Sequence, residues 1–240
     1  MPTELLYLDR PYETECISTV TQVEFTDLVV DRSIFYPTSF GQPNDKGKVI
    51  IDGKEFAIAD AWSDGLFVHL MSLYDPYPQD IAGKSVKQVI DWNIRHIHMR
   101  FRSAMYLVSG IAYEKLQCLT RMNETYDDQS WIDLLTDRDL TEELVKDIEA
   151  SANEKVASAL PITSRYISKE EFSGNGTLMF LNKNSIPDYE KIRVTEIPGM
   201  ATQFDMGIQV KNTSEIGKIT IKTTLVKGKI NKRLIINLAL

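Results

Sequence analysis

The sequence contains few of the residues that usually build metal centres or disulfide frameworks. Its 240 residues include two cysteines and three histidines. Cys16 and Cys118 stand far apart with no neighbouring thiols, so the pattern indicates neither a CxxC site nor a disulfide framework. His96 and His98 are two residues apart and would face different sides of a helix, whereas His69 lies in a region of β pattern. We therefore expect all five residues to have structural roles.

Two further absences limit the class of protein. No apolar run approaches the roughly 20 residues that a membrane helix needs, and the opening residues MPTELLYLDR lack the apolar core of a signal peptide. The formal net charge of −7 argues against indiscriminate binding to nucleic acid. We expect a cytoplasmic globular protein that binds neither membranes nor DNA.

The charge is nevertheless distributed unevenly along the chain. From residue 211 onward, a single acidic residue, Glu215, accompanies seven basic ones: Lys211, Lys218, Lys222, Lys227, Lys229, Lys232 and Arg233. A basic segment on an acidic chain indicates a local phosphate-binding face. Charge alone equally favours an edge hairpin whose lysines prevent aggregation.

The first 75 residues show the short apolar alternation that is typical of β-strands. Strands are expected at residues 17–25, 28–30, 49–51, 56–58 and 66–70, with turn signals between them. Short strands at this spacing predict a small barrel or sandwich, which we place at residues 1–82. The proline-containing segment 74–83 is expected to be a linker.

Residues 83–240 combine helical and strand patterns. Residues 91–107 (DWNIRHIHMRFRSAMYL) predict a long amphipathic helix that reaches about residue 119. A second apolar stripe predicts a helix over residues 140–156 that ends before Pro161, and a capping box at residues 168–171 predicts a short third helix.

Strands in this second part are expected at residues 174–181, 192–197, 209–211, 216–224 and 234–238, whereas residues 121–130 show only a polar stretch. The last two strands would be joined through residues 226–229. The fold class that follows is α+β: a small N-terminal β-barrel or sandwich, then a domain of long helices on one mostly antiparallel sheet.

Four segments in a fixed order carry a family resemblance. They are residues 35–47 (FYPTSFGQPNDKG), 91–107, 153–171 (NEKVASALPITSRYISKEE) and 192–219 (IRVTEIPGMATQFDMGIQVKNTSEIGKI). They are similar to the FYPxGGGQPxDxG, DWxxRxxHMRxHTAxHLL, NxxIxxxxPV…SxEEA and RVVxIxGxDxQPCGGTHVxxTxEIGxI segments of the alanyl-tRNA editing family. That family comprises the AlaX proteins and the editing domain of alanyl-tRNA synthetase. The resemblance implies a role in translation fidelity, an aminoacyl-tRNA deacylase as the ancestral activity, and tRNA(Ala) or its aminoacyl end as the partner.

The same resemblance raises the question of zinc. In that family, His-x-x-x-His on the helix and Cys-x-x-x-His on a later loop bind zinc, a ligand set that suits a tetrahedral, borderline-soft ion. The matching positions here hold Arg102, Tyr106, Asp205 and Gln209. Because a guanidinium is permanently charged and cannot bind zinc, we expect no cofactor and no metal at this site.

The charges of these replacements suggest what occupies the position of the metal. We hypothesise that Arg102 and Asp205 form an ion pair there, with hydrogen bonds added by Tyr106 and Gln209. The alternative is that each residue drifted separately to a solvated position. Ser103 replaces the family's threonine beside this cavity and would keep a hydroxyl that in relatives helps to choose the aminoacyl group; an ordinary helix serine is equally compatible.

The expected tRNA contacts come from two places. Ser39 and Phe40 replace two glycines of the family's glycine-rich loop, which leaves Gly41 and Gln42 as candidates, although a plain turn fits equally well. The basic C-terminal segment adds the remaining candidates: Lys218, Lys222, Lys227, Lys229, Lys232 and Arg233.

Three functions are compatible with this family resemblance and the four substituted ligand positions. The first is a protein that binds the aminoacyl-tRNA acceptor end without metal-dependent deacylase activity. The second is a metal-independent hydrolase of mischarged tRNA(Ala), such as Ser-tRNA(Ala), with Asp205 as general base and Arg102 stabilising the oxyanion. The third is a protein-interaction role on the same scaffold. We favour the first, because an aspartate held by an arginine has a lowered pKa and is a poor base.

Overall fold

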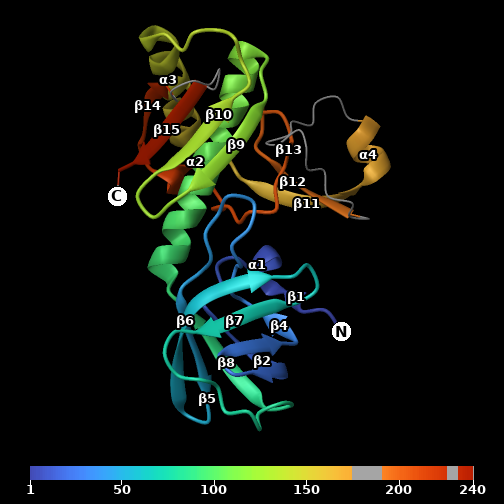
Figure 1. Ribbon diagram of the computed structural model, residues 1–240. Coiled ribbons are helices and arrows are strands. Elements are labelled where there is room, and N and C mark those ends of the chain that lie inside the picture. The colour runs from blue at the N-terminus through green and yellow to red at the C-terminus, as the bar shows by residue number, and fades with distance from the viewer. Residues whose placement is uncertain (175–190, 226–231, 240) are drawn as a thin grey trace. The chain divides into compact units, whose positions relative to one another are not determined.

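The computed structural model describes residues 1–174, 191–225 and 232–239 (Figure 1). The chain divides into two compact units, Met1–His98 and Met99–Leu240, and the longest helix, α2 (Trp92–Leu116), contributes residues to both. The domain boundary expected near residue 82 stays a prediction. Within the described residues, no helix is long and apolar enough to cross a membrane.

The first unit contains a closed barrel of six strands, which decides between the barrel and the sandwich. The strands pair antiparallel in the order β2-β3-β7-β6-β5-β8, and β8 pairs with β2 to close the barrel. Their bounds are β2 Glu15–Glu24, β3 Asp27–Val30, β5 Gly47–Ile51, β6 Lys54–Ser63, β7 Val68–Ser72 and β8 Ser85–Ile90. Three short elements precede or interrupt them: β1 (Glu4–Leu5), α1 (Leu6–Asp9) and β4 (Arg32–Ser33).

The apolar alternation of these strands fills the barrel. Leu28, Val49 and Leu70 are completely buried, as the strand patterns require. The segment 74–83, expected to be a linker, packs against the barrel instead. Tyr77 is buried with its ring centroid 5.1 Å from that of Phe56, so this segment belongs to the core of the first unit.

The second unit packs its helices with two antiparallel sheets rather than the single expected sheet. One sheet has the order β14 (Ile219–Leu225), β15 (Lys232–Leu238), β10 (Ser130–Leu134) and β9 (Thr120–Thr125). The other consists of β11 (Thr163–Ser168), β12 (Lys191–Glu196) and β13 (Gln203–Phe204). β9 and β11 were not predicted, because their many polar residues hide the strand pattern.

The predicted helices are present, with shifted ends. α2 begins after Asp91, whose carboxylate accepts a hydrogen bond from the Asn93 N–H at 3.0 Å, and ends at Leu116 rather than near residue 119. α3 (Glu142–Ala157) is capped by Thr141, and α4 (Lys169–Gly174) begins at the predicted capping box. The strand expected at residues 209–211 is irregular chain, and residues 175–181 and 226–229 lie outside the described residues.

Side chains of α3 bind the free edge of β14. The Asn153 amide donates to the Ile219 carbonyl and accepts from the Ile219 N–H, both at 2.9 Å. One turn earlier, the Glu149 carboxylate accepts the Ile221 N–H at 2.6 Å. These bonds satisfy backbone groups that an edge strand leaves open, and they fix where the chain enters β14.

Candidate functional site

Five candidate residues lie together in the second unit. Arg102, Ser103 and Tyr106 project from α2, whereas Asp205 and Gln209 come from the loop after β13. All five side chains are buried, and Gln209, at 6% exposure, is the most exposed of them. Separate drift to solvated positions therefore does not describe these residues.

Arg102 and Asp205 form a buried ion pair. The Arg102 Nε lies 3.1 Å from each carboxylate oxygen of Asp205, and the Arg102 Nη2 donates to Asp205 Oδ1. The Arg102 Nη1 donates in turn to the Asn123 side-chain oxygen on β9, at 3.3 Å. The guanidinium thus uses its planar set of donors to join α2, the loop at residue 205 and the four-stranded sheet.

The Asp205 carboxylate has further partners that favour its charged form. It accepts the Gly207 N–H at 2.7 Å and the amide of Gln209. Burial alone would raise the pKa of Asp205, but the charge and hydrogen bonds of Arg102, the Gly207 N–H and the charge of Arg193 together hold that pKa below its usual value. Asp205 is therefore ionised at neutral pH and poorly suited to accept a proton.

Tyr106 faces the three-stranded sheet. Its hydroxyl donates to the Thr195 carbonyl and accepts the Gln203 N–H at 3.0 Å. Burial, assisted by the charge of Asp205, raises the pKa of Tyr106 well above its ordinary value. The side chain is therefore a neutral phenol whose two hydrogen bonds connect α2 to β12 and β13.

Ser103 and Gln209 complete the network. The Ser103 hydroxyl donates to Gln209 Oε1 at 2.6 Å and accepts the Val210 N–H at 3.0 Å. Because Gln209 donates to Asp205, an unbroken chain of hydrogen bonds runs from Ser103 to Arg102. Ser103 already has these partners inside the protein, so its hydroxyl is part of the network.

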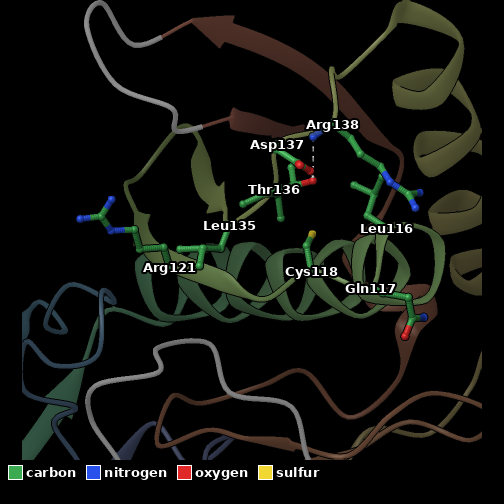
Figure 2. A pocket seen from close by; sticks show the side chains of 9 residues that line it. Leu116, Gln117, Cys118, Arg121, Leu135, Thr136, Asp137 and Arg138 are labelled. Atoms are coloured by element: carbon green, nitrogen blue, oxygen red, sulfur yellow. Dashed lines mark hydrogen bonds between the residues drawn. The ribbon is translucent and has the colours of Figure 1, made fainter.

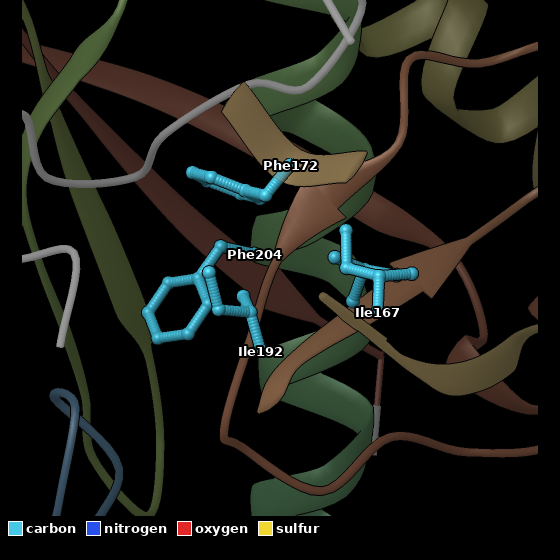
Figure 3. Close-up of a cluster of buried hydrophobic side chains, with 5 residues drawn as sticks. Ile167, Phe172, Ile192 and Phe204 are labelled. Atoms are coloured by element: carbon cyan, nitrogen blue, oxygen red, sulfur yellow. The ribbon is translucent and has the colours of Figure 1, made fainter. Parts of the chain in front are cut away.

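Arg193, which was not among the candidates predicted from the sequence, supports the loop at residue 205. The Arg193 Nη1 donates to the carbonyls of Asp205 and Gly207, at 3.0 and 2.7 Å. Phe204, which immediately precedes Asp205 in the chain, belongs to a buried apolar cluster (Figure 3) with Ile167, Phe172, Ile192 and Val194. Arg193 could have been nominated from the sequence, since it matches the arginine of the fourth family segment.

The candidate loop of the first unit is held by another buried ion pair. The Arg95 Nε donates to Asp45 Oδ1 at 2.6 Å, and the Arg95 Nη2 donates to Asp45 Oδ2 and to the Ile34 carbonyl. Gly41 has φ +74°, a left-handed conformation that favours glycine, and Gln42 is buried. This loop thus depends on residues of the first two family segments.

The basic candidates differ in their surroundings. Lys218 and Lys222 are exposed. Lys232 pairs with Asp139 at 2.5 Å, and Arg233 pairs with Asp133 at 2.6 and 2.9 Å. Lys227 and Lys229 lie outside the described residues, so their role stays a prediction.

A hollow of about 520 Å³ lies at the C-terminal end of α2 (Figure 2). Cys118 lines it together with Arg121, Arg138 and neighbouring apolar residues. Burial raises the pKa of the Cys118 thiol, which does not favour the thiolate that nucleophilic or metal chemistry requires. In residues 1–174, 191–225 and 232–239, no group of three or more His, Cys, Asp or Glu side chains is placed to hold a metal ion.

Comparisons with known proteins find relatives of two kinds, AlaX-M editing proteins and alanine–tRNA ligases. The alanyl-tRNA editing protein AlaX-M of Methanosarcina barkeri is 32% identical over 240 residues, covering 97% of each chain. The AlaX-M protein of Saccharolobus solfataricus is 28% identical over 232 residues, covering 96% of this chain and 97% of its own. The alanine–tRNA ligase of Methanothrix thermoacetophila is 30% identical over 229 residues, which are 92% of this chain and 24% of the ligase. No protein-family model matches the chain.

Proposed function

Because the chain belongs to the family of alanyl-tRNA editing proteins, we propose that it binds the aminoacyl-bearing end of a tRNA and lacks zinc-dependent deacylase activity. The observation that carries the proposal is the buried pair of Arg102 and Asp205. The bound tRNA would be tRNA(Ala) or another tRNA that presents a similar aminoacyl end.

The donor set at this site does not fit zinc. Of the four positions that match the family's ligands, only Asp205 carries a common zinc ligand, and its oxygens already accept hydrogen bonds from Arg102, Gly207 and Gln209. Tyr106 is a neutral phenol because its pKa is raised. Arg102 would repel a cation placed between these groups.

The guanidinium takes over the structural part of the metal's role. It supplies the positive charge that keeps the buried Asp205 carboxylate ionised, and its donors join α2 to the loop and to Asn123. Both charges are paired and hydrogen-bonded, which is the condition under which a buried ion pair is tolerated. The editing fold is thereby retained without a metal.

A metal-independent hydrolase is the alternative, and the geometry favours it less. A general base has to reach the attacking water and needs a pKa near the working pH. Asp205 is 1% exposed, and its pKa is lowered below the ordinary value of an aspartate. Arg102 likewise has its donors engaged by Asp205 and Asn123, so it is not free to stabilise an oxyanion.

Two assays test this proposal. We expect tRNA to be retained in filter binding with an affinity that falls as salt rises, because phosphate contacts release counterions. We expect Ser-tRNA(Ala), Gly-tRNA(Ala) and Ala-tRNA(Ala) to be deacylated no faster than without protein, with or without a chelator. The Methanosarcina barkeri relative serves as the control. Deacylation abolished by chelator would overturn the metal argument, chelator-resistant deacylation would support the alternative, and the absence of salt-dependent retention would refute tRNA binding.

A further inference from the structure

We infer that the outer face of the sheet β14-β15-β10-β9 is an RNA-binding surface on which a base of a single-stranded segment stacks. The inference rests on the proposed function and specifies which surface the RNA contacts. The outer face is defined by eight residues that alternate with the buried ones: Met122, Glu124, Trp131, Asp133, Thr220, Lys222, Arg233 and Ile235.

The opposite face of this sheet belongs to the protein core. Ile132, Leu234, Ile236 and Ile219 are completely buried. Alternation along each strand therefore turns the residues between them outward. In the register, Lys222 pairs with Ile235, Ile235 with Trp131 and Trp131 with Glu124, so these side chains form one row across the outer face.

The centre of the outer face is a planar cation stacked on an aromatic ring. The Arg233 Cζ lies 3.5 Å from the centre of the Trp131 ring. The Arg233 Nε and Nη2 donate to the two oxygens of Asp133, at 2.6 and 2.9 Å, and these bonds lie in the plane of the guanidinium. One face of the guanidinium therefore rests on the indole, and the side chain keeps 24% of its surface exposed, where a base would add a third layer. Nucleobases stack on arginine planes in this way.

Flanking residues provide the other contacts that a single strand needs. Met122 and Tyr126, which follow the same side of β9, are 51% and 45% exposed. Bases of a single strand stack on an exposed aromatic ring such as that of Tyr126, whereas bases of a duplex are covered by their neighbours. A duplex would therefore use this surface poorly.

Two exposed lysines of this region can contact a phosphate backbone. Lys218 and Lys222 are exposed, and neither forms an ion pair with the described residues. Asp133 and Asp139, the acids next to β15, are already paired with Arg233 and Lys232. Glu124 is the remaining acid of the outer face, and burial raises its pKa against the opposing charge of Arg102. Lys222 and Arg233 balance Glu124 and Asp133 on the outer face itself, so Lys218 and Lys222 are the exposed cations that can contact phosphate groups.

The test uses substitutions on the outer face and measures binding of tRNA and of a fluorescent single-stranded oligoribonucleotide. Arg233→Lys keeps the positive charge but removes the planar guanidinium on which a base would stack. We expect RNA binding to weaken roughly tenfold or more. Lys222→Gln should reduce the salt-dependence slope by about 0.7, the value for one phosphate contact on a single strand. Lys146→Gln, which removes an exposed lysine from α3, is the matched control and should change neither quantity.

Two safeguards keep the outcomes separate. Lys222→Glu changes only an exposed side chain, so its expected loss of binding does not depend on whether the Arg233 variant folds. Competition by a single-stranded oligoribonucleotide but not by a duplex of the same sequence is the expected result. If Lys222→Glu and Arg233→Lys bind tRNA as well as the unmodified protein, this inference is wrong and the proposed function stands. If the unmodified protein binds no tRNA, both are wrong.

Discussion

Replacing Arg102 with methionine is expected to lower the free energy of unfolding by about 3–5 kcal/mol, the usual cost of leaving a buried charge without its partner. Asp205 is 1% exposed, so water cannot take over from the guanidinium. The methionine fills a similar volume, which limits the contribution of an empty cavity. Chemical denaturation followed by circular dichroism measures the change.

The pH dependence distinguishes this cause from a general packing defect. In the unmodified protein the pKa of Asp205 is lowered, so its stabilising contribution is present above the unfolded pKa, about 3.9, and is lost as pH falls through the folded value. Without Arg102, burial is expected to raise the folded pKa of Asp205 above the unfolded value, so the variant gains stability on protonation. The difference in the free energy of unfolding between the unmodified protein and Arg102→Met should therefore shrink as the pH is lowered. A deficit that is constant with pH would contradict the ion-pair explanation.

Arg165 provides the matched control for this experiment. It is an arginine of the same unit whose side chain is 45% exposed and pairs with Glu171 and Glu196 at the surface. Exposed pairs contribute little, so Arg165→Met should cost less than about 1 kcal/mol. Equal costs for the two substitutions would show that burial of the pair is not the source of the effect.

Asp45→Asn is expected to destabilise the first unit by about 3–5 kcal/mol, for a related reason. The substitution keeps the shape of the side chain but leaves the fully buried Arg95 guanidinium without a counter-charge. It also weakens the hydrogen bond that the Tyr36 N–H donates to Asp45 Oδ2, which is 2.6 Å long in the unmodified protein. Hydrogen exchange should show lost protection at the Tyr36 amide.

An exposed aspartate of the same unit separates this effect from loss of charge in general. Asp52 pairs with Lys84 at 3.1 Å, and its side chain is 72% exposed. Its φ of +49° is tolerated by asparagine, so Asp52→Asn should cost less than about 1 kcal/mol. If Asp45→Asn were equally mild, the pair with Arg95 would not be what holds the loop.

The sequence predicted those elements whose apolar residues recur at a regular period. The barrel strands and α2 follow such periods, and four ordered segments indicated the family. The polar strands β9 (TRMNET) and β11 (TSRYIS) carry no such signal. They form strands because of the strands that lie next to them in the tertiary structure. The single expected sheet was wrong for this reason.

The candidate site was partly predictable from charge. Opposite charges at Arg102 and Asp205, at positions that match metal ligands, suggested an ion pair that the structure contains. Its hydrogen bond to Asn123 was not predictable, because Asn123 lies on a strand that the sequence did not reveal. The burial of Gln42 likewise depends on the tertiary fold around its loop.

We propose that an organic cation, the Arg102 guanidinium, stands at the position that the family resemblance assigns to a metal, and metal analysis tests this proposal most directly. The protein would be purified without chelator, incubated with excess zinc, freed of unbound ions by gel filtration and analysed by elemental mass spectrometry. We expect a zinc content far below one ion per chain. Stoichiometric zinc that is lost on replacing Asp205 with alanine in a folded variant would contradict it.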